Sequence, residues 1–191
     1  TCASVESCLS GPEGGISGVK DCALVIDFGT SLPASTIALG AQVEAAGGRY
    51  MDAPLGRTPA HAVEGKLNIM AAGSAEDFEC AKVTLADLGE YVFHVGPLGA
   101  GHTLKLINNF FGMTTSCAMA EAFAMADKAG VPRQTLYDVM SAGPLRSGMM
   151  DFVKARAVDG NPAMLAFSIA NARKDVGYYA TMADDLGVPS M

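Results

Sequence analysis

Short apolar runs and helix-forming segments take turns along the first half of the chain. The candidate strands cover residues 23–27, 49–52, 66–72 and 91–95. Between them, residues 35–46 carry helix-forming side chains up to Gly47-Gly48, and Ser74 opens a helix to about Ala86 with the Ser-x-x-acid pattern of a helix start. Because strands separated by helices of this length need crossover connections, the pattern predicts a sheet that is at least partly parallel.

From Gly99 onward the pattern is helical. Residues 102–129 contain no proline, and their apolar side chains recur at steps of three and four on one face and nearly as densely on the others. This pattern predicts a long helix that is buried almost all round. The shorter helices expected after it cover residues 133–141, 148–158 and 168–186. Residues 1–20 show no clear helix or strand. The change of pattern predicts an α/β part up to about Gly96, a hinge containing Gly96, Gly99 and Gly101, and an all-helical part after it.

Composition limits the classes of function. Only 17% of the 191 residues are charged, below the usual ~25%, and 50% are hydrophobic. Much of the chain is therefore expected to lie in a core or a subunit interface, which favours a homo-oligomer. No apolar run approaches ~18 residues, so no membrane span is expected, and a net charge of −7 without a Lys/Arg cluster argues against a nucleic-acid partner. Five cysteines without a Cys-x-x-Cys pair fit a reduced, cytoplasmic location.

Lys105 is the most informative candidate for chemistry. It lies in the long predicted helix among apolar neighbours, and steps of three and four place Asn108 and Asn109 near the same helix face. Burial of an ammonium group lowers its pKa, which makes it a proton donor usable near neutral pH. The alternative is that Lys105 extends from the helix end to solvent while the asparagines satisfy a loop. The residues alone leave both interpretations open.

Three further segments carry polar groups that could bind a ligand. Arg57 and Thr58 follow the second strand and could hold an anion, and Thr30 follows the first strand, at the edge where α/β sheets bind ligands. Arg173 and Lys174 precede Asp175 on the last helix. On composition alone each has a more ordinary explanation, namely a solvated loop arginine, a helix start and an exposed basic pair. The histidines show no metal-ligand spacing, so no metal is expected.

In order along the chain, four segments resemble the motifs of the β-hydroxyacid dehydrogenase family, part of the 6-phosphogluconate dehydrogenase superfamily. The matching residues are Asp27, Thr30 and Pro33; Asp52, Ala53, Pro54 and Leu55; Gly96, Gly99, Gly101, Lys105 and Asn109; and Lys174 with Asp175. Each motif alone is weak, but their shared order and spacing make the match specific. The departure is Gly56-Arg57-Thr58, where the family has Ser-Gly-Gly. This variant is similar to family members with a sulfonate substrate, in which the arginine faces the sulfonate.

The resemblance implies a fold, a cofactor and residue roles. Residues 1–96 would form the C-terminal part of a Rossmann-type domain for NAD or NADP, and residues 97–191 an incomplete helical substrate and dimerisation domain. The expected fold class is therefore a partial Rossmann-like α/β domain followed by an all-α domain with a long interdomain helix. Lys105 would donate the proton, and Asn109 would orient a small anionic substrate. The remaining implied roles are substrate binding for Gly56, Arg57, Thr58 and Asn108, and cofactor binding for Thr30 and Lys174.

The family's glycine-rich nucleotide loop and C-terminal helices have no counterpart in this sequence, so the chain is expected to be a fragment of a longer protein. The leading hypothesis is an NAD(P)-dependent oxidoreductase that interconverts a small 3-hydroxy acid, or a sulfonate analogue, and its aldehyde or ketone. A second hypothesis, an imine reductase of the same superfamily, is opposed by Lys105, which those enzymes usually lack. The third is a non-catalytic interaction or scaffold module, which the missing loop favours and the pair Lys105 and Asn109 opposes.

Overall fold

The expected helices and strands are present in the expected order. The computed structural model describes residues 1–190. In the first half the elements are α1 (Cys2–Leu9), the 3-10 helix η1 (Gly15–Gly18), β1 (Leu24–Asp27), α2 (Pro33–Ala45), β2 (Arg49–Asp52), β3 (Leu55–Gly56), α3 (Pro59–Val63), β4 (Leu67–Ala72), α4 (Ala75–Leu88) and β5 (Gly89–Gly96). The helices that follow are α5 (Ala100–Ala129), α6 (Arg133–Ser141), α7 (Gly148–Ala157) and α8 (Ile169–Asp185). This order confirms the expected fold class, a Rossmann-like α/β part followed by helices.

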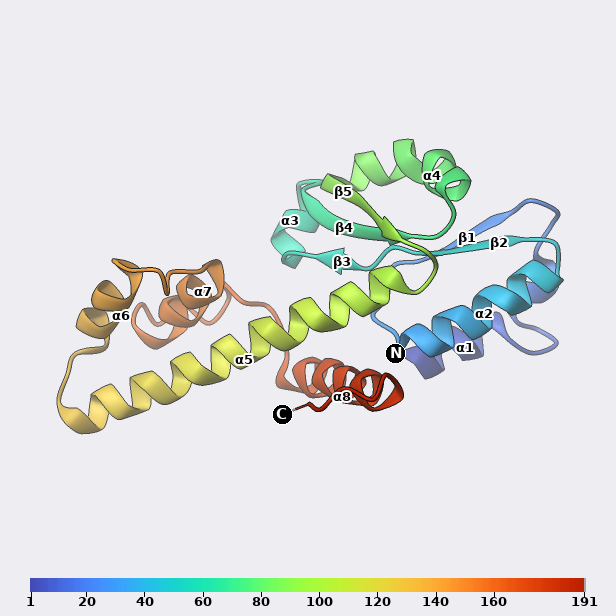
Figure 1. The fold of residues 1–191 in the computed structure, drawn as a ribbon. Helices are drawn as coiled ribbons and strands as arrows, with labels where there is room; N and C mark the ends of the chain where they lie inside the picture. The colour runs from blue at the N-terminus through green and yellow to red at the C-terminus, as the bar shows by residue number, and fades with distance from the viewer. Residues whose placement is uncertain (191) are drawn as a thin grey trace. The chain divides into compact units, whose positions relative to one another are not determined.

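The strands form a mixed sheet. β1 and β2 are parallel, and their register pairs Asp27 with Asp52. β4 runs antiparallel to β2 and β3 and parallel to β5, so the prediction of a partly parallel sheet is confirmed. Figure 1 shows α4 on one face of the sheet and α1 with α2 on the other. The paired ends of β1 and β2 place two carboxylates next to each other at one edge of the sheet.

The chain divides into two compact units. The first contains Thr1–Ile107 together with the chain from Lys174 onward, and the second contains Asn108–Arg173. The border therefore falls inside α5 and inside α8. The division into residues 1–96 and 97–191, which the sequence suggests, stays a prediction.

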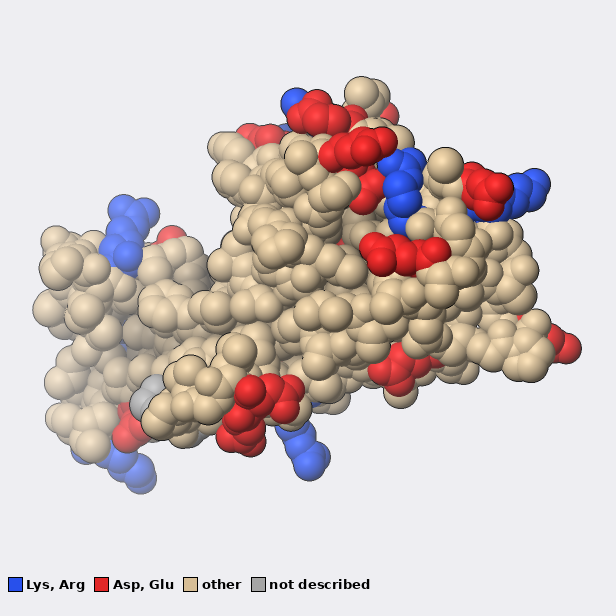
Figure 2. Space-filling model, turned by 45° about the vertical axis from the view of Figure 1, so that its right-hand side comes forward, with Lys and Arg blue, Asp and Glu red and all other residues tan. Residues whose placement is uncertain are grey.

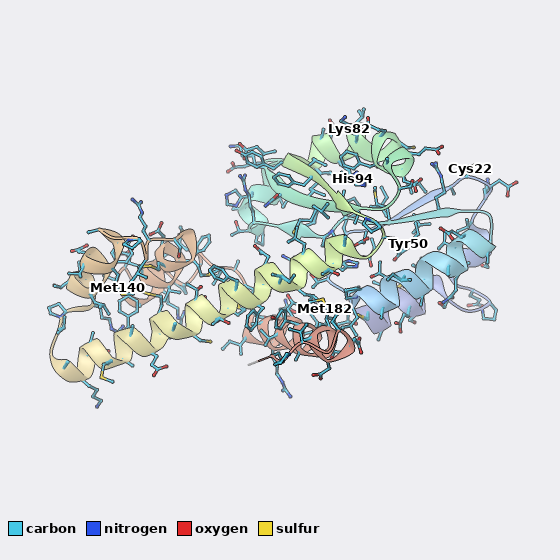
Figure 3. All side chains as sticks on the ribbon, viewed as in Figure 1. Cys22, Tyr50, Lys82, His94, Met140 and Met182 are labelled. Carbon is cyan, nitrogen blue, oxygen red and sulfur yellow. The ribbon has the colours of Figure 1, made fainter. Side chains whose placement is uncertain are left out.

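In the first unit, the side chains of consecutive residues of β2 pack on opposite faces of the sheet. Tyr50 packs with Leu39 and Val43 of α2, whereas Met51 is fully buried in the cluster that α4 covers. Figure 3 shows Tyr50 on the α2 side of the sheet and His94 on the α4 side, where its ring stacks on Phe78 with 4.6 Å between centroids. This alternation is the two-residue period of a strand, and it buries a core on both faces.

The prediction that residues 1–20 contain no clear helix is wrong. Residues 2–9 form α1, whose N-terminus is capped by the Thr1 side chain, which accepts a hydrogen bond from the backbone N–H of Ser4. Val5 and Leu9 pack against the α2 cluster. An eight-residue helix is too short for a clear periodic pattern, and its stability comes from this packing.

The prediction that the long helix is buried almost all round is also wrong for the described residues. In the second unit, Met119 and Phe123 of α5 pack with Met150 of α7 and with side chains of α6. Phe111 and Met125, by contrast, are 72% and 67% exposed. The helices α6 and α7 cover only part of the surface of α5, so the apolar residues outside that part face solvent in the chain as described.

Uncharged side chains dominate the surface seen in Figure 2, with Asp/Glu and Lys/Arg in small separate groups. Within residues 1–190, no helix combines the length and apolarity that crossing a membrane requires. The same residues contain no group of three or more His, Cys, Asp or Glu side chains arranged to hold a metal ion. All five cysteines have free thiols.

Candidate active site

The first turn of α5 is held against the ends of β1 and β2 by the glycine motif. Gly99 has φ +91°, a conformation that favours glycine, and its N–H donates to Asp52 Oδ1 at 2.8 Å. The N–H of His102 donates to Asp52 Oδ2 at 2.7 Å. A Cβ at Gly101 would lie 2.4 Å from the carbonyl oxygen of Met70, so only glycine allows this approach. The carboxylate of Asp52 therefore satisfies donors that a helix start leaves unpaired.

His102 lies between two carboxylates and is fully buried. Its Nδ1 is 2.7 Å from Thr36 Oγ1, and its Nε2 is 3.9 Å from Asp27 Oδ2. Burial lowers the pKa of His102, and the charges of Asp52 and Asp27 act in the opposite direction. Burial likewise raises the pKa of Asp52, while the N–H donors of Gly99 and His102 favour its carboxylate form. The side chain of His102 is therefore a neutral imidazole near neutral pH.

Lys105 follows one helical turn after His102 on α5. Burial lowers the pKa of its ammonium group below the usual 10.5. The charge of Asp175 opposes this shift, and the charge of Lys174 adds to it. The structure therefore gives Lys105 the environment of a proton donor, and its electrostatic partners come from α8.

Lys174 and Asp175 are not an ordinary exposed pair. The Lys174 Nζ is 2.7 Å from Asp175 Oδ1 and lies 5.2 Å from the centre of the Tyr178 ring. Asp175 is only 2% exposed, which corrects the surface explanation for this segment. The Tyr178 hydroxyl accepts a hydrogen bond from the backbone N–H of Cys2, so α8 is also held against α1.

Thr30 lies in the loop between β1 and α2, at the same edge of the sheet. The loop turns at Gly29, whose N–H donates to Asp27 Oδ1 at 2.7 Å. The next side chain, Ser31, is buried, and its Oγ has no hydrogen-bond partner within residues 1–190. A buried hydroxyl without a partner is a costly arrangement in a protein. The Ser31 hydroxyl of this loop is therefore available for a hydrogen bond that residues 1–190 do not supply.

The side chain of Arg57 contacts other residues of the first unit. It adopts φ +73° directly after β3, donates from Nη1 to the Lys66 carbonyl at 2.8 Å, and forms an ion pair with Glu90. Its guanidinium lies 5.0 Å from the centre of the Tyr91 ring. A freely solvated loop arginine would show none of these contacts. They hold the guanidinium next to β5, and a role in substrate binding stays a prediction.

The other predicted substrate residues lie in two places. Gly56 ends β3, where a Cβ would come within 3.2 Å of the Asn68 side chain. Thr58 is the N-cap residue of α3, with its Oγ1 2.7 Å from His61 Nδ1. Asn108 and Asn109 belong to the second unit, where Asn108 Nδ2 donates to Asn109 Oδ1 at 3.5 Å and Asn109 is buried. None of these contacts tests the predicted roles.

The residues that sequence reasoning missed are those that join the elements. Asp52 belongs to a motif, but the sequence assigns it no role; His102 belongs to none of the motifs, and Glu90 lies in a strand whose pairing the sequence does not reveal. The signal that could have found Asp52 is an acidic residue at a strand end followed by a glycine-rich helix start. The hydrogen bonds of Asp52 join it to Gly99 and His102, which lie 47 and 50 residues away in sequence, so they can be recognised only once the fold is known.

Two family models together match almost the whole chain. Residues 1–96 match the NAD binding domain of 6-phosphogluconate dehydrogenase. Residues 99–191 match the model described as NAD-binding of NADP-dependent 3-hydroxyisobutyrate dehydrogenase. The chain belongs to this dehydrogenase family. The family resemblance drawn from the motifs is thus confirmed.

Named relatives share this membership. 3-Sulfolactaldehyde reductase of Escherichia coli is 34% identical over 97% of this chain, and 2-(hydroxymethyl)glutarate dehydrogenase of Eubacterium barkeri is 27% identical over 97%. The structure of 3-hydroxyisobutyrate dehydrogenase from Salmonella typhimurium has a TM-score of 0.84 and 28% identity over 99% of this chain and 66% of its own. The chain spans 62% of the length of the two curated relatives.

Proposed function

We propose that the protein is an NAD(P)-dependent oxidoreductase that interconverts a small 3-hydroxy acid, or a sulfonate analogue, and the corresponding aldehyde or ketone. The observation that carries this proposal is Lys105 on α5, a half-buried ammonium group whose pKa is lowered by desolvation and on which the charges of Asp175 and Lys174 also act. The relatives named above support the reaction class. The test is NAD(P)H oxidation by the full-length protein with small semialdehydes bearing a carboxylate or a sulfonate, and an absence of turnover on all of them would contradict it.

Lys105 acts as the general acid in carbonyl reduction. The nicotinamide, when bound, supplies the hydride that adds to the carbonyl carbon. The Nζ of Lys105 gives a proton to the carbonyl oxygen, so the product is an alcohol and the lysine is left as a neutral amine. In the oxidation direction the neutral amine accepts the proton from the hydroxyl. Desolvation lowers the pKa of the ammonium group, so its neutral form is reached at a lower pH than in an exposed lysine.

The loop after β1 fits the nicotinamide end of the cofactor. Thr30 and the buried Ser31 hydroxyl lie at the edge of the sheet where open α/β sheets bind ligands, and Ser31 Oγ has no partner in residues 1–190. The charge of Lys174 lowers the pKa of both His102 and Lys105, so Lys174 lies within electrostatic reach of these two side chains. We infer that Thr30 and Lys174 contact the nicotinamide half. No glycine-rich loop for the pyrophosphate lies in this chain.

Arg57 is proposed to bind the anionic group of the substrate. Its guanidinium offers paired donors to a carboxylate or a sulfonate, and Glu90 and Tyr91 hold it in place. Arg57→Lys keeps the charge and loses the paired donors. We expect kcat/KM on the preferred anionic aldehyde to fall about ten- to hundred-fold, since one charge-assisted contact contributes about 1.5–3 kcal/mol. An uncharged aldehyde is the control, and equal losses on both substrates would show that Arg57 only supports its loop.

A homo-oligomer is the proposed assembly. Exposed apolar side chains on α5, including Phe111 and Met125, favour a partner surface that buries them. Sedimentation velocity of the full-length protein at micromolar concentration is expected to show a species larger than one chain. Phe111→Asp is expected to shift that species toward the monomer, because a charge on a buried interface is costly. A stable wild-type monomer would contradict the assembly.

One relative favours a second candidate, a module without turnover. The cytokine-like nuclear factor N-PAC of Xenopus tropicalis is 27% identical over 98% of this chain. Its name describes a nuclear factor and not an enzyme. The two candidates differ in whether Lys105 is needed for any measurable reaction. Binding of NAD(P)H without turnover on any carboxylate or sulfonate semialdehyde would favour the second.

A further inference from the structure

The side chain of Asp52 accepts two buried hydrogen bonds from the start of α5. Its side chain is fully buried at the end of β2, and both of its oxygens accept backbone N–H groups, from Gly99 at 2.8 Å and from His102 at 2.7 Å. These donors belong to the start of α5, almost fifty residues away in sequence. A carboxylate in this position also complements the positive end of the helix dipole. One side chain thus fixes where α5 begins.

His102 ties the same turn to two further elements. Its Nδ1 lies 2.7 Å from Thr36 Oγ1 on α2 and 3.7 Å from Asp52 Oδ2 on β2. Its Nε2 faces Asp27 at the end of β1, at 3.9 Å from Oδ2. The imidazole therefore sits among β1, β2 and α2 and allows the first turn of α5 little freedom to rotate or slide.

Lys105 lies three residues after His102, which is one turn further along the same helix. A helix is stiff over one turn, so the position of His102 determines the position of Lys105. The charges of Asp175 and Lys174 on α8 act on the pKa of Lys105. The route from Asp52 to Lys105 that the hydrogen bonds provide is the backbone of α5.

We infer that Asp52 and His102 are positioning residues, which anchor the first turn of α5 to the ends of β1 and β2 and so hold Lys105 in its half-buried place on that helix. The inference rests on the proposed function of Lys105 as the proton donor. Beyond that function, the inference states that catalysis also depends on Asp52 and His102, which contact neither substrate nor cofactor in the proposed mechanism. Misplacement of a reacting group by about 1 Å is enough to cost roughly a hundred-fold in rate.

The first measurement follows Lys105 itself. In the full-length protein labelled with ¹³C-lysine, the Lys105 side-chain resonance, assigned by Lys105→Arg, is titrated with pH in the wild type and in Asp52→Asn. Asparagine can accept from one of the two N–H groups, but its own amide N–H₂ meets the other, so the first turn loses an anchor. We expect greater hydration of Lys105 and an upward shift of its pKa by roughly half to one unit.

The second measurement is kinetic. Asp52→Asn is expected to lower kcat for carbonyl reduction about ten- to hundred-fold with a smaller change in the KM for NAD(P)H. Asp77→Asn is the matched control. Asp77 is also a buried carboxylate, it lies at the start of α4, and it pairs with Arg49 at 2.8 Å. It is expected to lower the unfolding temperature while leaving the Lys105 pKa and kcat near their wild-type values.

Paired substitutions at His102 provide the test if Asp52→Asn does not fold. His102→Asn keeps a polar atom near the position of Nδ1, facing Thr36, whereas His102→Gln keeps one near the position of Nε2. The asparagine variant is expected to retain more of the wild-type kcat and a smaller shift in the Lys105 pKa. A Lys105 pKa and kcat that stay unchanged in every folded variant, with only the unfolding temperature lowered, would overturn the inference. The pKa readout holds even if the protein reduces no carbonyl, so the two proposals fail separately.

Discussion

Replacing Lys105 with alanine in the full-length protein is expected to lower kcat for carbonyl reduction by about 10²–10⁴-fold, the usual contribution of a positioned general acid. The affinity for NAD(P)H is expected to change little, because the lysine acts on the carbonyl oxygen. Steady-state kinetics gives kcat, and quenching of protein fluorescence or a change in NAD(P)H fluorescence gives the dissociation constant. A loss confined to kcat indicates an interaction made in the transition state.

Two further variants make this result specific. Lys105→Arg keeps the positive charge but cannot give up its proton near neutral pH, so it is expected to be nearly as slow as the alanine variant. Lys82→Ala removes an exposed lysine of α4 that pairs with Glu79, and its kcat is expected to match the wild type. Near-normal turnover of Lys105→Ala would remove the lysine from the mechanism and favour the module without turnover.

The pH dependence of the wild type provides an independent reading of the same group. Only the ammonium form donates a proton, so the rate of reduction is expected to fall as pH rises through the pKa of Lys105. Burial places that pKa below the usual lysine value of 10.5, and Asp175 limits how far it falls. Asp175→Asn removes the opposing charge, so the decline in rate is expected to begin at lower pH than in the wild type.

The local hydrophobic pattern is sufficient to predict the helices and strands, but it is insufficient to predict the contacts in the candidate active site. Residues 49–52 and 133–141 form a strand and a helix with the bounds expected from hydrophobic spacing, because both are bordered by residues that end or begin regular structure. Lys105 was identified from its apolar neighbours on a helix, and its lowered pKa agrees with the burial that they implied. These are properties that neighbours in sequence largely determine.

Properties that depend on pairing between distant segments did not follow from the pattern. Asp52 was a motif position without a role until the fold brought Gly99 and His102 to its two oxygens. Arg57 was assigned either to solvent or to an anion, and the structure places it against Glu90 of β5, a contact that depends on how β3, β4 and β5 pair. The exposure of Phe111 likewise depends on which surfaces of α5 its neighbours cover.

Gly101 gives the largest expected effect on stability. A Cβ at this position would lie 2.4 Å from the Met70 carbonyl oxygen, 2.8 Å from Asp52 Oδ2 and 3.0 Å from Pro54 Cδ. Backbone and a buried carboxylate cannot move aside as a flexible side-chain end can. Gly101→Ala must therefore push the start of α5 away from the ends of β2 and β4, which weakens both hydrogen bonds to Asp52.

The expected cost of Gly101→Ala is about 3 kcal/mol or more, the upper part of the range for inserting a group into a packed core. For a chain of this size that corresponds to a fall in the unfolding temperature of roughly 6–12 °C, measured by circular dichroism. Gly177→Ala on α8 is the matched control, since a Cβ there meets no atom within 4 Å. It is expected to raise stability by about 0.5–1 kcal/mol, because alanine loses less conformational freedom in a helix than glycine. An unfolding temperature for Gly101→Ala equal to that of Gly177→Ala would show that α5 does not pack this closely against the sheet, and the anchoring of Lys105 through Asp52 would lose its basis.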